Sequence, residues 1–366
     1  MPNDYHDQIQ LARTRRLRAL LRELPDVCSD YFLSIEQLTS SLTRLSYAYD
    51  LKLFFQYLSD ELPKFSGKAI PEFTADDLRR VTKQDLERYA RYLTLYVKNG
   101  SKADGDSREI TNHEYSIKRK YASLRAFYKY LFAESIVPSN IAALVPLPKL
   151  HERAIIRLDV DEVARILDLA ENGQELPKTY QKYHRVTQKR DLAMLSLFLG
   201  TGIRISECVG LNIDDFDFEQ NAFVITRKGG KEVILYLSDE VADALKDYLA
   251  ERREIDALPG HERAFFLSIQ RRRITQRAVE NMVKKYAAIA APLKKKISPH
   301  KLRSTFGTNL YRETGDIYLV ADVLGHSDVN TTRKHYAAIA EDHRRIAAQK
   351  TVLREEPIHA DLPPQD

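Results

Sequence analysis

The sequence predicts a mainly α-helical protein of two domains, with a small antiparallel β-sheet in the second. A chain of 366 residues is long for one domain and sufficient for two, each with a hydrophobic core of its own. Apolar residues recur at steps of three and four in the first third and again after residue 239, which is the spacing of a buried helix face. Two β-rich runs flank Gly229 and Gly230, the pattern of a β-hairpin.

Composition excludes several classes of protein. Hydrophobic residues make up 43% and charged residues 30%, which excludes a wholly disordered chain. No apolar run approaches the roughly 20 residues of a membrane helix, and residues 1–18 lack the apolar centre of a signal peptide, so we expect a cytoplasmic protein. Cys28 and Cys208 have no metal-ligand spacing and cannot build a disulfide framework. The net charge of +5 permits a polyanionic partner without requiring one.

The first third indicates successive helices and no strand. One apolar stripe predicts a helix with that face buried, and its residues are Leu38, Leu42, Leu45, Tyr49, Phe54 and Leu58. A second helix is expected over residues 75–97, with a break where Thr82 to Asp85 carry capping chemistry. Residues 99–106 are polar and contain two glycines, which indicates a loop.

The clearest amphipathic helix has apolar residues at steps of four, three, four and three, namely Ile117, Tyr121, Leu124, Tyr128 and Leu131. On a neighbouring face, Lys118, Arg125 and Lys129 follow one another at steps of seven and four. A DNA-binding helix has such a face, and so does an ordinary solvated helix. The sequence leaves both interpretations open.

Prolines at 138, 146 and 148 stop the helical pattern and place a domain boundary near residue 150. We therefore divide the chain into an N-terminal extension (1–29), a helical domain (30–145), a linker (146–157), a second domain (158–353) and a disordered tail (354–366).

The second domain opens with a predicted helix over residues 159–170 and a polar insertion over 171–189. A helix over 190–198 follows and ends at the glycines of 200–202. Strands are expected at 221–226 and 232–237, and helical patterns after them.

Polar side chains gather where a fold alone does not require them: residues 201–207, the hairpin tip at Lys228, residues 298–303, and residues 324–327 with Tyr336. Among the side chains that they supply are two arginines, a lysine, two histidines, a carboxylate and a phenol. This set suits phosphoryl transfer without a nucleotide or a metal ion.

The charge of the reacting phosphate is one half of that chemistry. A phosphodiester under attack gathers negative charge on its non-bridging oxygens, and the guanidinium groups of Arg204 and Arg303 can bind those oxygens in a bidentate way. His326 can donate to the same oxygens, and Glu207, one helical turn after Arg204, can orient the basic groups.

Proton transfer is the other half. A phenol with a pKa of about 10 needs a base, and His300 can serve because it lies one helical turn before Arg303. The departing alkoxide needs a proton, which Lys228 can supply from the hairpin tip.

These stretches resemble the signature motifs of the tyrosine recombinases, the phage integrase family. The motifs are Thr-Gly-Ile-Arg-Ile-Ser-Glu at 201–207, Arg-Lys-Gly-Gly-Lys at 227–231, His-Lys-Leu-Arg at 300–303 and Leu-Gly-His-Ser at 324–327, followed by Tyr336. Residues 46–58 and 124–131 resemble the helical core-binding domain of the same family, so the resemblance covers residues 30–350. Within the family, the sequence is most similar to the Xer recombinases, of the single-recombinase XerS kind.

The resemblance implies a SAM-like helical core-binding domain and a mainly α catalytic domain with a small antiparallel sheet. It implies Tyr336 as nucleophile, Glu207 as supporting acid, and a phosphate-activating set of Arg204, Lys228, His300, Arg303 and His326. The interval from His326 to Tyr336 is ten residues where many Xer proteins have nine, so Tyr311 and Tyr318 are kept as less favoured nucleophiles. Lys231 is likewise the less favoured alternative to Lys228.

The implied activity is site-specific recombination of double-stranded DNA by a homotetramer on two sites, through a 3′-phosphotyrosyl intermediate and without a cofactor. The implied cellular role is chromosome dimer resolution at a dif-like site, with a septal DNA translocase of the FtsK type as partner. Three alternatives stay open: a mobile-element integrase or excisionase, a non-catalytic DNA-binding regulator, and a type IB topoisomerase.

Two further features remain open. The charge runs at 271–273 and 294–296 could contact DNA phosphates or be solvated. A helix over 337–353 could dock on a neighbouring protomer, as in relatives, or pack on its own domain.

Overall fold

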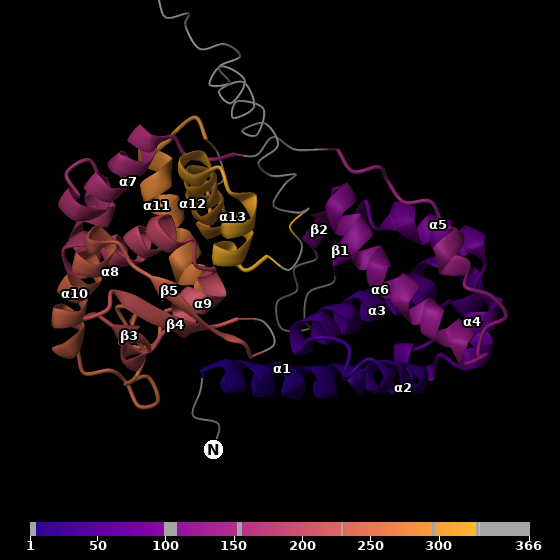
Figure 1. Cartoon of the computed structure of the whole chain (residues 1–366). Helices are drawn as coiled ribbons and strands as arrows, with labels where there is room; N and C mark the ends of the chain where they lie inside the picture. The colour runs from indigo at the N-terminus through magenta and orange to yellow at the C-terminus, as the bar shows by residue number, and fades with distance from the viewer. Residues whose placement is uncertain are drawn as a thin grey trace, which may run out of the picture. The chain divides into compact units, whose positions relative to one another are not determined.

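A computed structural model of the chain describes residues 5–98, 108–151, 156–227, 230–294 and 297–326, together with residue 329. The chain forms two compact units, Met1–Arg153 and Ala154–Asp366 (Figure 1). No helix in the described part of the chain is long and apolar enough to cross a membrane. The predicted loop at 99–106, helix at 337–353 and tail at 354–366 lie outside the described residues.

The first unit is mainly helical. Its described elements are α1 (Tyr5–Leu21), α2 (Asp26–Ser34), α3 (Ser41–Glu61), η1 (Pro63–Phe65), η2 (Ile70–Glu72), α4 (Ala75–Arg80), α5 (Lys83–Tyr92), β1 (Leu95–Lys98), β2 (Arg108–Thr111), α6 (Glu114–Ala133) and η3 (Ile141–Leu144). Leu17 and Leu20 of α1 lie in the same hydrophobic core as Phe54 of α3 and Tyr128 of α6. The segment expected as an extension, 1–29, thus contributes to this core through α1 and α2.

The predicted helix around residue 50 is present as α3, but the first half of its predicted buried stripe is wrong. Leu38 precedes the helix, and Leu38 and Leu42 are 80% and 51% exposed. The buried face carries Leu51, Phe54 and Phe55 instead. Apolar residues surround most of α3, so more than one stripe fits the helical spacing, and the packing of α1 and α6 decides which is buried.

The single helix predicted over residues 75–97 is three elements. The predicted break at Thr82 is confirmed: its hydroxyl accepts from the Asp85 amide at 3.2 Å, and the Asp85 carboxylate accepts from the Thr82 amide at 2.8 Å. The prediction of no strand is wrong, because β1 pairs antiparallel with β2. Four residues are too few to show an alternation in the sequence.

The predicted amphipathic helix over 117–131 is confirmed as part of α6. Each of its five stripe residues is buried, from Ile117 to Leu131. They face the core that also holds Phe54, which explains why this helix has the most regular spacing in the chain.

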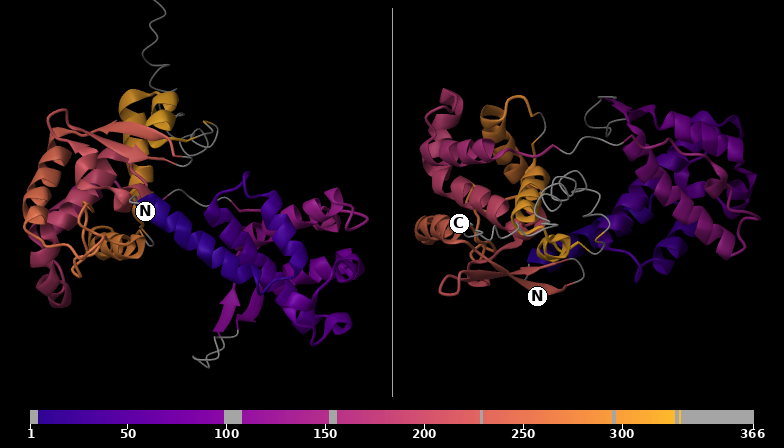
Figure 2. Two further views of the ribbon diagram at one scale, coloured as in Figure 1. Left: turned by 90° about the horizontal axis from the view of Figure 1, so that it is seen from below. Right: turned by 45° about the horizontal axis from the view of Figure 1, so that its top comes forward.

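The second unit surrounds a long central helix. Its described elements are α7 (Val160–Asn172), α8 (Lys178–Thr201), α9 (Ile205–Gly210), η4 (Ile213–Asp215), β3 (Phe216–Asp217), β4 (Ala222–Thr226), β5 (Glu232–Tyr236), α10 (Asp239–Arg253), α11 (Gln276–Ala290), α12 (Pro299–Thr314) and α13 (Ile317–Leu324). Helix α8 packs against α7, α10 and α12 (Figure 2).

The predicted β-hairpin is confirmed. Strands β4 and β5 are antiparallel, with Val224 opposite Ile234, and the short strand β3 adds a third strand that the sequence did not indicate. In Figure 1 the hairpin runs along the second unit toward the end of α13. The tip residues 228 and 229 lie outside the described residues.

Much of the segment expected as a polar insertion is helix, because α8 begins at Lys178. The residues of this segment that α8 buries are polar, His184 and Thr187. The Thr187 hydroxyl donates to the Asp191 carboxylate at 3.0 Å, which also accepts from Arg190 at 2.7 Å and from Lys285 and the Tyr286 hydroxyl at 3.0 Å each. Hydrophobic periodicity cannot reveal a face that is buried through ion pairs and hydrogen bonds.

Candidate active site

The turn after α13 is the meeting point of the predicted site. Gly325 has a left-handed φ of 60° and ends the helix. The His326 amide donates to the Ala321 carbonyl at 2.9 Å, and the Gly325 amide donates to the Asp322 carbonyl at 2.8 Å. These two bonds form a Schellman motif, so the backbone that carries His326 is fixed by the helix end.

Arg204 and Glu207 form the first contact with this turn. Arg204 caps α9, and its guanidinium donates to a Glu207 carboxylate oxygen at 2.8 Å and to the Gly325 carbonyl oxygen at 2.7 Å. The second Glu207 oxygen accepts from the Arg204 amide at 2.9 Å. Glu207 is only 6% exposed, so its charge is balanced mainly by Arg204.

Arg303 forms the second contact, from α12. Its guanidinium donates to the carbonyl oxygens of Gly202 and Leu324, and the residue is 5% exposed. His300 lies one turn earlier on the same helix and is exposed. Pro299 at the start of α12 has no amide hydrogen to leave unpaired there, which favours a helix start at this position.

Gly202 allows the end of α8 to lie close to α12 and to α13. It ends α8 with a φ of 62°, and a Cβ placed there would lie 2.4 Å from the Phe306 ring and 2.8 Å from Leu324. Only a glycine combines this backbone conformation with this contact distance. The motif at 201–207 therefore needs its glycine for packing as well as its arginine for charge.

The structure brings Arg204, Glu207 and Arg303 to the turn that holds His326, with His300 on the helix of Arg303. Lys228 and Tyr336 lie outside the described residues. Of the two less favoured nucleophiles, Tyr311 is buried in an apolar cluster with Val320 and Leu324, and Tyr318 is 72% exposed.

One contact of this turn was not predicted from the sequence. Arg227, the residue before Lys228, donates to the carbonyl oxygens of Asp322 at 3.1 Å and Val323 at 2.6 Å. Its place in the motif at 227–231 was the available signal. The described residues of the site thus include three guanidinium groups and the Glu207 carboxylate, an excess of positive charge that suits an anionic ligand.

Cys208, next to Glu207, has no part in such chemistry. It is fully buried, and burial raises the pKa of its thiol well above the usual range. Cys208 is a residue of the hydrophobic core.

In the first unit, the three cations of the predicted DNA-binding face of α6 differ in their exposure and in their hydrogen bonds. Lys129 is exposed and Lys118 is half-buried. The Arg125 guanidinium instead donates to the carbonyl oxygens of Ala142 at 3.2 Å and Val145 at 2.7 Å, which ties η3 and the residue after it to α6.

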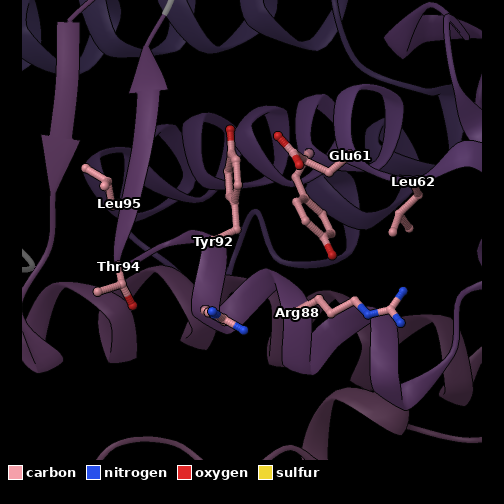
Figure 3. Close-up of a pocket in the computed structure, with 8 residues that line it drawn as sticks. Glu61, Leu62, Arg88, Tyr92, Thr94 and Leu95 are labelled. Carbon is pink, nitrogen blue, oxygen red and sulfur yellow. The ribbon is translucent and has the colours of Figure 1, made fainter.

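A hollow of about 490 Å³ lies in the first unit, between α3 and α5. Glu61, Arg88 and Tyr92 line it (Figure 3). None of the predicted catalytic residues belongs to its lining. The candidate active site is therefore a different place, built on the turn of the second unit.

Comparison with known proteins identifies the family. Residues 157–343 match the phage integrase family. The tyrosine recombinase XerC of Caldanaerobacter subterraneus subsp. tengcongensis is 32% identical over 336 residues, which cover 89% of this chain and 86% of that protein. The tyrosine recombinase XerS of Streptococcus equi subsp. zooepidemicus is 29% identical, over 89% of this chain and 95% of that protein.

Solved structures share the fold. The XerH site-specific recombinase bound to a palindromic difH substrate has a TM-score of 0.59 at 19% identity, covering 95% of this chain and 97% of that one. The Tn1549 transposon integrase in complex with circular intermediate DNA has a TM-score of 0.62 at 20% identity, covering 88% and 99%. The predicted fold class is confirmed, and the chain belongs to the phage integrase family, as a tyrosine recombinase related to the Xer proteins.

Proposed function

We propose that the protein is a site-specific recombinase that cuts and rejoins double-stranded DNA through a 3′-phosphotyrosyl intermediate, with Tyr336 as nucleophile. The observation that carries the proposal is the convergence of Arg204 and Arg303 on the turn that presents His326. A guanidinium has five N–H donors, and the contacts of Arg204 with Glu207 and Gly325 leave some of them for a phosphate.

The cleavage step balances as follows. The Tyr336 oxygen forms a bond to phosphorus, the bond from phosphorus to the 5′ oxygen breaks, and the phenolic proton passes to His300. Lys228 gives a proton to the departing 5′ oxygen. Arg204, Arg303 and His326 stabilise the negative charge on the non-bridging oxygens, while Glu207 holds Arg204 in place.

Rejoining reverses these steps with a 5′ hydroxyl from a partner duplex. One phosphodiester is exchanged for one phosphotyrosyl ester and back, so the reaction needs no nucleotide cofactor. Pairwise exchange between two sites requires four active sites, which supports a homotetramer on two copies of the DNA site.

The proposed division of labour follows the two units. Residues 30–145 form the core-binding domain, which contacts DNA through the α6 face of Lys118 and Lys129, with Arg125 bracing that helix. Residues 158–353 form the catalytic domain. The segment 1–29 is an N-terminal extension that packs into the core of the same domain through α1 and the start of α2, and the segments 146–157 and 354–366 are the linker and the tail. Both domains contact duplex DNA, and the protein acts in the cytoplasm.

We assign the cellular role to chromosome dimer resolution at a dif-like site, with a septal DNA translocase of the FtsK type as partner. The relatives named XerC and XerS support this role. A mobile-element integrase is the alternative, since it would use the same chemistry on the same fold.

A plasmid resolution assay tests the proposal. The substrate carries two directly repeated copies of a candidate site, taken either from the host's replication terminus or from the ends of a mobile element. We expect two product circles with the terminus site, and a loss of about 100-fold in Arg204→Ala. Arg165→Ala is the matched control, because Arg165 is an exposed arginine of the same unit paired with Glu175 at 2.7 Å.

The other outcomes separate the alternatives. Resolution only with element ends would indicate an integrase. Relaxation of the supercoiled plasmid without resolution would indicate a topoisomerase. Binding to the sites without any covalent product would indicate a DNA-binding regulator.

A further inference from the structure

The last turn of α13 receives arginine side chains from three separate elements of the second unit. Arg204 comes from the start of α9, Arg303 from α12 and Arg227 from the residue after β4. Between them they donate to four successive carbonyl oxygens, those of residues 322 to 325. Phosphate binding accounts for Arg204 and Arg303, but the proposed chemistry gives Arg227 no part.

Arg227 fits this turn closely. A Cβ placed on Gly325 would lie 2.4 Å from a terminal nitrogen of Arg227 and 2.5 Å from its central carbon, so the guanidinium lies directly against the glycine backbone. Burial lowers the pKa of Arg227, while Glu207 raises it and Arg204 lowers it. The Arg227 guanidinium therefore lies close enough to Glu207 and Arg204 to interact electrostatically with both.

Stability alone does not explain an arginine at this place. The helix end is already closed by the Schellman bonds of Gly325 and His326. The Nε of Arg227 is buried and has no hydrogen-bond partner among the described residues. Burying an unpaired N–H costs free energy, so a cap selected only for stability would not include it.

The chain position of Arg227 suggests what its contacts achieve. Its amide donates to the Lys231 carbonyl at 2.8 Å, and its carbonyl accepts from the Gly230 amide at 3.1 Å. Arg227 thus closes the base of the hairpin turn that contains Lys228. A side chain fixed to residues 322 and 323 fixes the base of this turn relative to His326.

We propose that Arg227 is a positioning residue, which joins the base of the Lys228 hairpin to the turn of His326 so that the proton donor and the phosphate-binding groups are placed together. This inference rests on the proposed function, in which Lys228 protonates the departing 5′ oxygen. A catalytic group misplaced by about 1 Å can cost a factor of about 100 in rate.

The test compares two nicked suicide duplexes of one sequence, with oxygen or sulfur as the 5′ bridging atom of the scissile phosphate. In the oxygen duplex the leaving alkoxide requires a proton. In the sulfur duplex the bond from phosphorus to sulfur breaks and a thiolate leaves without one. Single-turnover rates of covalent complex formation are normalised to their amplitudes, so that unfolded molecules do not enter the rate.

We expect Arg227→Gln to cleave the oxygen duplex about 10- to 100-fold more slowly than the wild type, and the sulfur duplex at a rate within about threefold. On the oxygen duplex, the rate of Arg227→Lys should lie between those of the wild type and Arg227→Gln, because an ammonium cannot donate to two carbonyls in the fork geometry of a guanidinium.

Arg252→Gln is the structural control. Arg252 donates to the carbonyls of Ala264 and Glu262 elsewhere in the unit, at 3.0 and 2.8 Å, and its loss should lower the melting temperature without changing either rate. Equal rates of Arg227→Gln and wild type on oxygen would overturn the proposal, as would an equal loss on both duplexes. Lys228→Met must itself recover on sulfur, and its failure to do so would contradict the proposed function of Lys228 rather than the placement of Arg227.

Discussion

The Arg204 guanidinium donates to the Gly325 carbonyl at 2.7 Å and joins two residues that are 121 positions apart in the chain. Its other terminal nitrogen donates to Glu207 at 2.8 Å. Arg204 is therefore held between a carboxylate on one side and the turn of His326 on the other. This arrangement makes the orientation of Arg204 depend on Glu207.

Replacing Glu207 should affect both folding and cleavage. We expect Glu207→Ala to lower the free energy of unfolding by about 1–3 kcal/mol, since a buried partner of an ion pair and a cap of α9 are lost together. Glu207→Gln keeps an oxygen for the Arg204 amide and should lose less stability while still slowing cleavage. Urea denaturation and suicide-substrate cleavage measure the two effects, and equal behaviour of the two variants would refute this view of Glu207.

Two left-handed glycines allow backbone strain to be separated from steric contact. Gly202 and Gly315 have φ of 62° and 67°, but only at Gly202 does a Cβ meet neighbours, whereas at Gly315 nothing lies within 4 Å. Alanine at either position costs about 1–2 kcal/mol for the conformation. Gly202→Ala should lower the free energy of unfolding by a further 1–3 kcal/mol or so because of overpacking. Urea denaturation of the two variants measures this difference in free energy. Equal losses would mean that Phe306 and Leu324 move aside without cost.

The ion pairs of Asp191 predict how the stability of the second unit changes at low pH. Burial opposes ionisation, but Arg190 and Lys285 outweigh it, and the pKa of Asp191 lies below its usual range. A carboxylate with a lowered pKa contributes stability above its unfolded pKa of about 3.9, and this contribution is lost as the pH falls through the folded pKa. Asp191→Asn should be less stable by about 3 kcal/mol at pH 7.

The same variant should lose less stability than the wild type when the pH is lowered from 5 to 2. Unfolding free energies at a series of pH values give both curves. Parallel curves for the two proteins would show that Asp191 is not the group whose protonation destabilises the fold.

The three cations of the α6 face should behave in two ways. Lys129→Ala should weaken DNA binding and reduce the slope of log K against log salt by about 0.9 for one lost phosphate contact. Arg125→Gln should lower the melting temperature, because its guanidinium holds the carbonyls of Ala142 and Val145. Fluorescence anisotropy over a salt series measures the effect of Lys129→Ala on DNA binding, and thermal denaturation measures the effect of Arg125→Gln on stability. An unchanged slope for Lys129→Ala would favour the solvated interpretation of this face.

The sequence predicted the parts of the fold that rest on apolar periodicity or on turn chemistry. The stripe of α6, the capping box at Thr82 and the hairpin around Gly230 are local patterns, and each is present. The motifs at 201–207 and 300–303 likewise indicated residues that meet at one turn. The proposed function accounts for this meeting, because guanidinium groups can bind the non-bridging oxygens of a phosphate in a bidentate way.

The rest depended on contacts between distant residues. The buried face of α3 is chosen by α1 and α6, and the polar part of the buried face of α8 is held by contacts of Asp191 with Lys285 and Tyr286 of α11. The charge run at 271–273 shows the same limit. Arg271 and Arg272 are exposed, but Arg273 donates to the carbonyls of Val209, Gly210 and Leu211 and braces the end of α9. No local pattern distinguishes it from its neighbours.

Covalent trapping on a nicked suicide duplex carrying the recombination site tests the central claim most directly. Wild-type protein and Tyr336→Phe are incubated with the labelled duplex and separated on a denaturing gel, with Tyr318→Phe as the matched control. We predict a DNA-linked band in the wild type and in Tyr318→Phe and none in Tyr336→Phe. A band of equal strength in Tyr336→Phe would contradict the account, because the phosphotyrosyl bond would then form on another residue.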